Sequence, residues 1–263
     1  MPSRRKELTL AATQENVSLD ETTSKSKRQT RRQRRNCPTP AELEDDEDIQ
    51  PSSPPIVAQT SIPIALLDVV QMASPIRLLV CSIGNTAPYH NTLHSAGHCV
   101  LNVLQRSLKY PSYRATKSYG KGIVSEGCPL TLWQSKSLMN VSGTGVKSAW
   151  RKFKNVVGPD NARLVILHDE LELKLGAVKV RDGSSSPKGH NGLKDIAAKL
   201  PGQKYTRIGV GIGRPESRDR TAVAGYVLKK MSPMELAKIE GAWVEVAAAL
   251  KKMQEESLER DGL

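Results

Sequence analysis

The sequence has few cysteines, and they lack the spacings typical of metal sites. Its 263 residues include four cysteines, with no CxxC pair and no Cys/His ligand spacing. This argues against a zinc site. Cys81 and Cys99 lie in apolar runs, which predicts two buried thiols and no bridge. Such cysteine usage fits a reducing intracellular compartment.

Long apolar runs are also missing, so no segment is expected to span a membrane. Residues 56–73 are interrupted by Pro63 and Asp68 and follow no basic region, which excludes a secretory signal. Residues 4–6 are basic and could open a mitochondrial presequence, but acidic residues follow closely. We therefore expect a cytoplasmic protein, with a mitochondrial location as the alternative.

Three common catalytic motifs are absent as well. The loop at Gly84 lacks GxGxxG, so dinucleotide binding is not supported. No Walker loop and no GxSxG elbow is present, which argues against P-loop and serine-hydrolase chemistry.

The first 54 residues differ in composition from the rest of the chain. They contain no aromatic residue, and ten Lys/Arg balance ten Asp/Glu. Such a segment cannot bury enough apolar surface to offset the entropy of ordering it. The basic block 25–35 could be a nuclear-localisation or RNA-binding patch. We favour a solvated tail that pairs loosely with the acidic block 42–48. The predicted parts are a disordered extension and linker (1–70), one domain (71–255) and a C-terminal tail (256–263).

The net charge of +12 belongs to residues 55–263, because the first 54 residues are neutral. A basic folded part is expected for a protein with a polyanionic partner. The alternative is a basic protein with no nucleic-acid role.

Strand-like and helix-like segments alternate along the remaining chain. This order predicts one α/β domain with a mixed, mostly parallel sheet flanked by helices. The expected strands are 76–82, 122–124, 130–133, 163–168, 177–181 and 205–211, and the expected helices are 94–109, 142–155 with Ser142 as N-cap, 191–200, and 233–252 starting at Pro233.

Three asparagines stand where loops meet these elements, and a histidine lies near the first. They are Asn85, Asn140, Asn191 and His94. An asparagine amide offers a donor and an acceptor without charge, which suits a carbonyl substrate and a water better than a metal. His94 is the candidate base, and Asp169, at the end of a predicted strand, could orient it.

Three other histidines are expected to have structural roles and no catalytic one. His98 and His168 are predicted to be structural, and His190 to form a hydrogen bond at the start of a helix.

Six short segments follow one another along the chain. They are Gly84-Asn85 with Tyr89 and His94, Met139-Asn140-Val141-Ser142-Gly143, His168-Asp169-Glu170-Leu171, Gly189-His190-Asn191-Gly192, Arg207-Ile208-Gly209-Val210-Gly211 and Tyr226-Val227-Leu228. Taken in this order, the segments resemble the bacterial-type peptidyl-tRNA hydrolase family over residues 76–250. The extension ahead of them suggests a eukaryotic, fungal-like member.

The resemblance implies hydrolysis of the ester between a peptide and the terminal ribose of tRNA. His94 would be the general base that activates water, and Asp169 would orient it. Asn85 would read the peptide's first amide and so separate blocked from free aminoacyl-tRNA.

The resemblance also implies how the tRNA end is held, without a metal or another cofactor. Asn140 and Asn191 would hold the substrate end and the water, and Tyr89 would line the pocket. Leu138 stands where the family has an aromatic residue. The family's basic positions for terminal phosphates match Lys179, Arg181 and Arg207. We expect a monomer, and the alternatives are an RNA-binding, splicing-type module on the same fold or an inactive paralogue.

Overall fold

The described part of the chain is residues 76–260 of a computed structural model, with the side chains of 257–260 left out. These residues belong to one compact unit. The predicted extension, residues 1–70, lies outside the described residues. None of the described helices is both long and apolar enough to cross a membrane.

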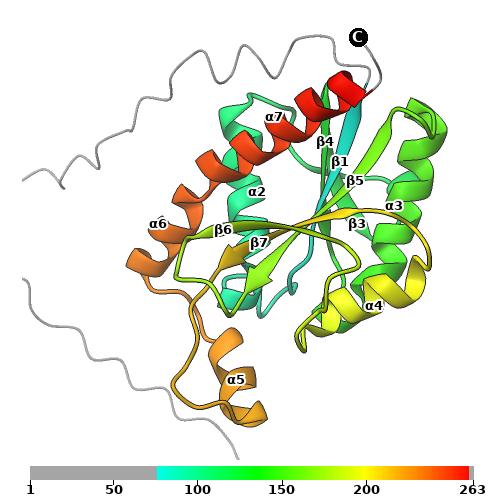
Figure 1. Cartoon of the computed structure of the whole chain (residues 1–263). Helices are drawn as coiled ribbons and strands as arrows, with labels where there is room; N and C mark the ends of the chain where they lie inside the picture. The colour runs from blue at the N-terminus through cyan, green and yellow to red at the C-terminus, as the bar shows by residue number, and fades with distance from the viewer. Residues whose placement is uncertain (1–75, 261–263) are drawn as a thin grey trace, which may run out of the picture. The chain divides into compact units, whose positions relative to one another are not determined.

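A seven-stranded mixed sheet forms the centre, in the order β2-β3-β4-β1-β5-β7-β6 (Figure 1). The four strands β4, β1, β5 and β7 run parallel, and the edges at β2-β3 and β6 are antiparallel. This confirms the predicted fold class. The strands are β1 (Arg77–Ser82), β2 (Arg114–Ala115), β3 (Gly122–Glu126), β4 (Leu130–Ser135), β5 (Ala162–Glu170), β6 (Val178–Asp182) and β7 (Thr206–Gly211).

Helices cover both faces of the sheet, which is why the central strands are apolar on both sides. Helices α3 and α4 pack on one face, and α2, α6 and α7 pack on the other (Figure 1). Cys81 and Cys99 are buried free thiols, as predicted. The helices are α2 (Ala96–Ser107), α3 (Ser142–Val157), α4 (Asn191–Lys199), α5 (Arg220–Val227), α6 (Pro233–Gly241) and α7 (Trp243–Arg260), with the 3₁₀ turns η2 (Leu93–Ser95), η3 (Lys117–Tyr119) and η4 (Met139–Val141).

Two predicted helix boundaries are wrong. The expected helix 233–252 is divided at Ala242 into α6 and α7, and α7 continues to Arg260. Pro233 does start α6, with Ser232 as N-cap. Gly241 is the last residue of α6, which fits the low helix propensity of glycine, and α6 and α7 pack on the same hydrophobic core.

Helix α5 was not predicted, and one predicted helix cap is wrong. Val227 is the buried residue of α5, so the helix has too little apolar periodicity to be recognised. Its N-cap, Asp219, accepts the N–H groups of Thr221 and Ala222. Ser142 is the first residue of α3 and not its N-cap, and its hydroxyl donates to the carbonyl of Met139 at 2.9 Å.

The parallel strands bring the predicted site residues to one edge of the sheet. The carboxyl ends of β1 and β5 are adjacent, because Ser82 pairs with Leu167. The loop after β1 carries Asn85, the end of β5 carries Asp169, and α3 and α4 begin beside them. Ligands of parallel α/β sheets bind at this edge.

Candidate active site

His94 and Asp169 form a hydrogen-bonded pair at the carboxyl edge of the sheet. His94 lies in η2, and its Nδ1 is 2.8 Å from Oδ2 of Asp169. The side chains are 16% and 1% exposed. Burial alone would lower the pKa of His94, but the charge and hydrogen bond of Asp169 raise it above its usual value. The pair has the geometry of a base with its orienting acid.

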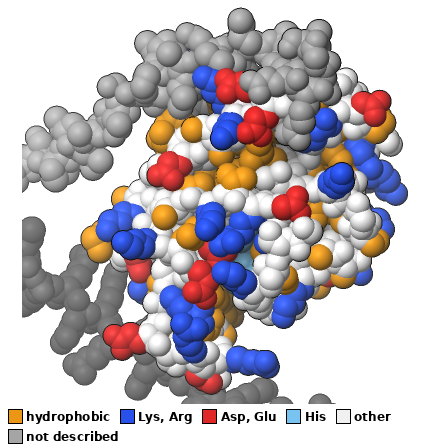
Figure 2. Space-filling model, viewed as in Figure 1, with side chains coloured by type: hydrophobic (Ala, Val, Ile, Leu, Met, Phe, Trp, Pro, Cys, Tyr) orange, Lys and Arg blue, Asp and Glu red, His pale blue; other side chains and the backbone are white. Residues whose placement is uncertain are grey.

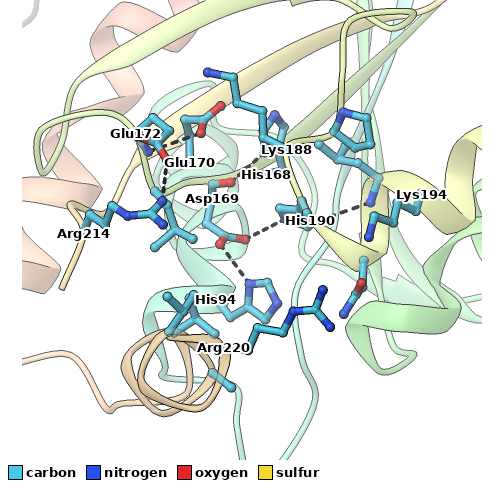
Figure 3. Close-up of a pocket in the computed structure, with 18 of the residues that line it drawn as sticks. His94, His168, Asp169, Glu170, Glu172, Lys188, His190, Lys194, Arg214 and Arg220 are labelled. Atoms are coloured by element: carbon cyan, nitrogen blue, oxygen red, sulfur yellow. Dashed lines mark hydrogen bonds and ion pairs between the residues drawn. The ribbon is translucent and has the colours of Figure 1, made fainter. Parts of the chain in front are cut away.

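Asp169 has a second imidazole partner, which was not predicted. Nε2 of His190 is 3.1 Å from Oδ1 of Asp169 (Figure 3). His190 is also the N-cap of α4, where its Nδ1 accepts the N–H of Leu193 at 3.3 Å. A ring nitrogen that accepts carries no proton, so Nε2 must be the donor to Asp169.

The two donors determine the charge of Asp169 and the tautomer of His94. Burial by itself raises the pKa of Asp169, but His94 and His190 hold it below its ordinary range. An ionised carboxylate only accepts, so Nδ1 of His94 is the N–H that it binds. Nε2 of His94 is therefore left with its lone pair, as a general base requires.

His168 is buried next to this pair and contacts both Asp169 and His190. It is 2% exposed, its Nδ1 is 2.7 Å from the carbonyl oxygen of Asp169, and its ring meets His190 edge-on with centroids 5.3 Å apart. Burial, together with the neighbouring His190, lowers the pKa of His168 to about 3, so the ring stays neutral. His98 lies elsewhere, with its Nδ1 2.6 Å from Ser82 Oγ, and burial lowers its pKa to about 4.

The asparagines lie on adjoining segments but have different surroundings. Asn85 is 6% exposed, and its Oδ1 accepts the N–H of Met139 at 2.8 Å, which ties the loop after β1 to η4. Asn140 and Asn191 are exposed, at the middle of η4 and the first residue of α4. A Cβ added at Gly192 would lie 2.5 Å from Sδ of Met139, so glycine is what allows α4 to begin against η4.

A cavity of about 560 Å³ opens beside the pair, with His94, Asp169, His190 and Asn191 in its wall. Much of the remaining wall is basic, and Figure 2 shows Lys and Arg side chains gathered around α5 on this side. The basic residues of the wall are Lys188, Lys194, Arg207, Arg214, Arg218 and Arg220. Of these six residues only Arg207 was predicted as a site residue, although three arginines between 214 and 220, just after a strand, were a usable signal.

The three predicted phosphate-binding residues do not form one open surface. Lys179 is exposed on β6, whereas Arg181 is half-buried and 4.0 Å from Glu170. Arg207 is 2% exposed, and its guanidinium donates to the carbonyl of Ser186 at 3.3 Å. Burial lowers the pKa of Arg207 from its usual value. In this conformation Arg207 holds the loop before α4.

Tyr89 and Leu138 lie outside this cavity wall. Tyr89 is 41% exposed in the loop after β1, and Leu138 is 50% exposed just before η4. Both therefore offer exposed apolar surface on the segments that carry Asn85 and Asn140.

The histidine–aspartate cluster is also the place where a metal ion could bind. His94, Asp169 and His190 each offer one ligand atom, and these atoms lie within 4.8 Å of one another. The hydrogen bonds between them account for this proximity without an ion. The absence of a metal in the reaction stays a prediction.

Comparisons with known proteins agree on one family. The family model described as peptidyl-tRNA hydrolase matches residues 79–261. The chain is 37% identical to the peptidyl-tRNA hydrolase of Rhodococcus jostii over 69% of this chain and 93% of that protein. It is 36% identical to a probable peptidyl-tRNA hydrolase of Schizosaccharomyces pombe, over 62% of this chain and 75% of that protein. The crystal structure of peptidyl-tRNA hydrolase from Acinetobacter baumannii superposes with a TM-score of 0.56 at 28% identity, covering 71% of this chain and 92% of that one.

Proposed function

The chain belongs to the peptidyl-tRNA hydrolase family, and we propose that it hydrolyses the ester that joins a peptide to tRNA, with His94 as the general base. The observation that carries the assignment of the base is the arrangement around Asp169. Two imidazole N–H groups bind this carboxylate, which leaves Nε2 of His94 unprotonated beside the cavity.

The reaction proceeds by attack of water on the ester carbonyl. Nε2 of His94 takes a proton from the water, and the oxygen bonds to the carbonyl carbon. The tetrahedral intermediate then expels the ribose oxygen, which takes the proton back from the His94 imidazolium. Asp169 stabilises that imidazolium through Nδ1. The products are tRNA with a free hydroxyl and a peptide whose new carboxyl group loses its proton to solvent.

Asn140 and Asn191 position the reacting groups. Both side chains are exposed at the site, and Asn191 stands in the first turn of α4. Amide donors and a helix N-terminus both favour the negative charge that develops on the carbonyl oxygen. We assign these two residues to the ester carbonyl and the attacking water.

Asn85 selects substrates with a blocked amino group. Its Oδ1 is already bonded to Met139 N–H, so its free contribution is the amide N–H₂. This donor suits the carbonyl oxygen that an acylated amino group carries and a free aminoacyl group lacks. Tyr89 and Leu138 supply apolar surface beside it.

The basic cavity wall holds the tRNA end. Arg214, Arg218 and Arg220 line the cavity near the base, and guanidinium groups bind phosphates well. Lys179 and Arg181 on β6 extend this surface toward the first phosphates of the acceptor stem. We place the activity in the cytoplasm, with mitochondria as the alternative, and expect a monomer, which light scattering after size exclusion would test.

The test is release of peptide from N-acetylaminoacyl-tRNA and from unblocked aminoacyl-tRNA. The wild type should release from the blocked form alone, and His94→Ala should lose this release. His90→Ala, which removes an exposed histidine from the preceding loop, is the control and should keep it. Binding of tRNA by the wild type without any release would instead favour the RNA-binding module.

A further inference from the structure

Helix α3 carries exposed positive charge that the site does not use. Its sequence from Ser142 to Val157 includes four Lys/Arg and no Asp/Glu. Two of these, together with three lysines from the neighbouring segments, form an exposed group that we call the α3 ridge. The α3 ridge is Lys117, Lys121, Lys136, Lys147 and Arg151.

These five residues come together through backbone packing. Lys147 and Arg151 are one turn apart on the outer side of α3, opposite the buried Val146 and Phe153. The turn η3 and the residues after it pack along the helix, because Gly120 lies against Ser148 and the carbonyl of Lys121 lies beside Gly145.

Lys136 joins the ridge at the edge of the sheet that carries the site. Its backbone N–H donates to the carbonyl of Lys121 at 3.1 Å. It also stands four residues before Asn140. The ridge therefore begins beside the site and continues along α3, and Figure 2 shows Lys and Arg side chains on the side of the molecule where α3 lies.

The charges of the ridge are not neutralised by neighbouring acids. Within residues 76–260, cations such as Arg114 and Lys229 form ion pairs with glutamates, but no member of the ridge does. The nearby carboxylate of Asp195 accepts the N–H of Gly143 at 2.7 Å. A solvated surface normally mixes both signs, whereas a one-signed surface attracts a polyanion.

We propose that the α3 ridge binds backbone phosphates of the substrate tRNA beyond its aminoacylated end. This inference rests on the proposed function, because that substrate is the polyanion the reaction brings to the site. The ridge lies on the β3 side of α3, while β6, with Lys179 and Arg181, is the opposite edge strand of the sheet. A stem whose 3′ end enters between these two surfaces is held on both sides of the site.

The test compares a whole substrate with a truncated one. The full-length chain and its Lys147→Gln/Arg151→Gln variant are assayed on N-acetylaminoacyl-tRNA and on the same acyl group esterified to the 3′-terminal trinucleotide. The matched control is Lys251→Gln/Lys252→Gln on α7, which removes two charges from the other face of the sheet.

For the ridge variant, KM for the tRNA substrate should rise about tenfold at low salt, with kcat unchanged. The slope of log(kcat/KM) against log[salt] should become less steep by about 1.5 to 2, as expected for two lost phosphate contacts. Activity on the trinucleotide ester should not change, and the control should match the wild type.

Two results would overturn the proposal. One is a variant with the wild-type KM and salt slope, and the other is an equal loss of activity on both substrates, which would indicate damage to the site. Filter binding of uncharged tRNA measures tRNA affinity independently of catalysis. If the wild type releases no peptide from either substrate, the proposed function fails. The salt dependence of tRNA affinity in the wild type and the ridge variant then still decides whether the ridge contacts tRNA.

Discussion

Replacing Asp169 with asparagine tests the central feature of the site, which is one carboxylate serving two imidazole donors. Nδ1–H of His94 and Nε2–H of His190 each bind one carboxylate oxygen. An amide has a single acceptor oxygen, and its NH₂ group would face the second donor. His190 is held in its tautomer by the N–H of Leu193, so His94 is the ring that must change. A changed tautomer would put a proton on Nε2, where the lone pair is needed.

Two losses add in this variant. Loss of a charge-assisted hydrogen bond to the imidazolium formed in the reaction costs about 2 kcal/mol. The unfavourable tautomer adds about 2 kcal/mol, comparable to the cost of one unsatisfied buried group. A total of about 4 kcal/mol corresponds to a fall in kcat of about a thousandfold. The fold should persist, because the two side chains have nearly the same shape.

The assay is the pH dependence of kcat/KM on N-acetylaminoacyl-tRNA. In the wild type, activity should rise with pH through a value above 6.5, because Asp169 raises the pKa of His94 and the base works when neutral. In Asp169→Asn the charge is gone and burial remains, so the rise should move to lower pH while the plateau falls. Asp182→Asn, on exposed β6, is the control. A variant that keeps more than about a tenth of the activity, or whose rise stays in place, would refute the reasoning.

Two further substitutions test how the pair is held. His190→Ala should lower kcat about 30-fold with little change in KM, because Asp169 loses one charge-assisted hydrogen bond. Loss of the N-cap of α4 should also lower the melting temperature. An unchanged kcat would contradict this role of His190. Gly192→Ala should lower kcat, because the added Cβ would force α4 away from Met139. Gly241→Ala is the control and should leave kcat unchanged, because nothing lies within 4 Å of a Cβ added there. An equal change in kcat for both variants would contradict the packing argument.

Much of the fold was predictable because the central elements have simple patterns. Strand β5 is a continuous apolar run buried on both faces, and its end places Asp169 at the edge where ligands bind. The pairing of His94 with Asp169 was expected for the same reason. Helix α4 was expected from its apolar spacing, and the structure starts it at Asn191 as predicted.

What escaped prediction depends on contacts between distant segments. His190 was expected to cap a helix, and it does, but its bond to Asp169 depends on how α4 packs beside β5. Helix α5 buries too little apolar surface to show a period, although it forms part of the cavity wall. Arg207 was expected to bind terminal phosphates, but it is buried because β7 lies between β5 and β6 and the loop at Ser186 contacts its guanidinium.

The ion pair of the site stabilises the fold most at a lower pH than the one at which catalysis is fastest. The folded pKa of Asp169 lies below the unfolded value, so its contribution is present above about pH 4 and is lost as the pH falls through the folded pKa. The folded pKa of His94 lies above the unfolded value, so its contribution is present below about pH 6.5 and is lost as the pH rises through the folded pKa. The ion pair therefore stabilises the fold most between about pH 4 and 6.5, whereas catalysis needs His94 neutral, at higher pH. The difference in melting temperature between wild type and Asp169→Asn should be larger at pH 5.5 than at pH 8.5, and an equal difference at both would show that His94 does not charge in the folded protein.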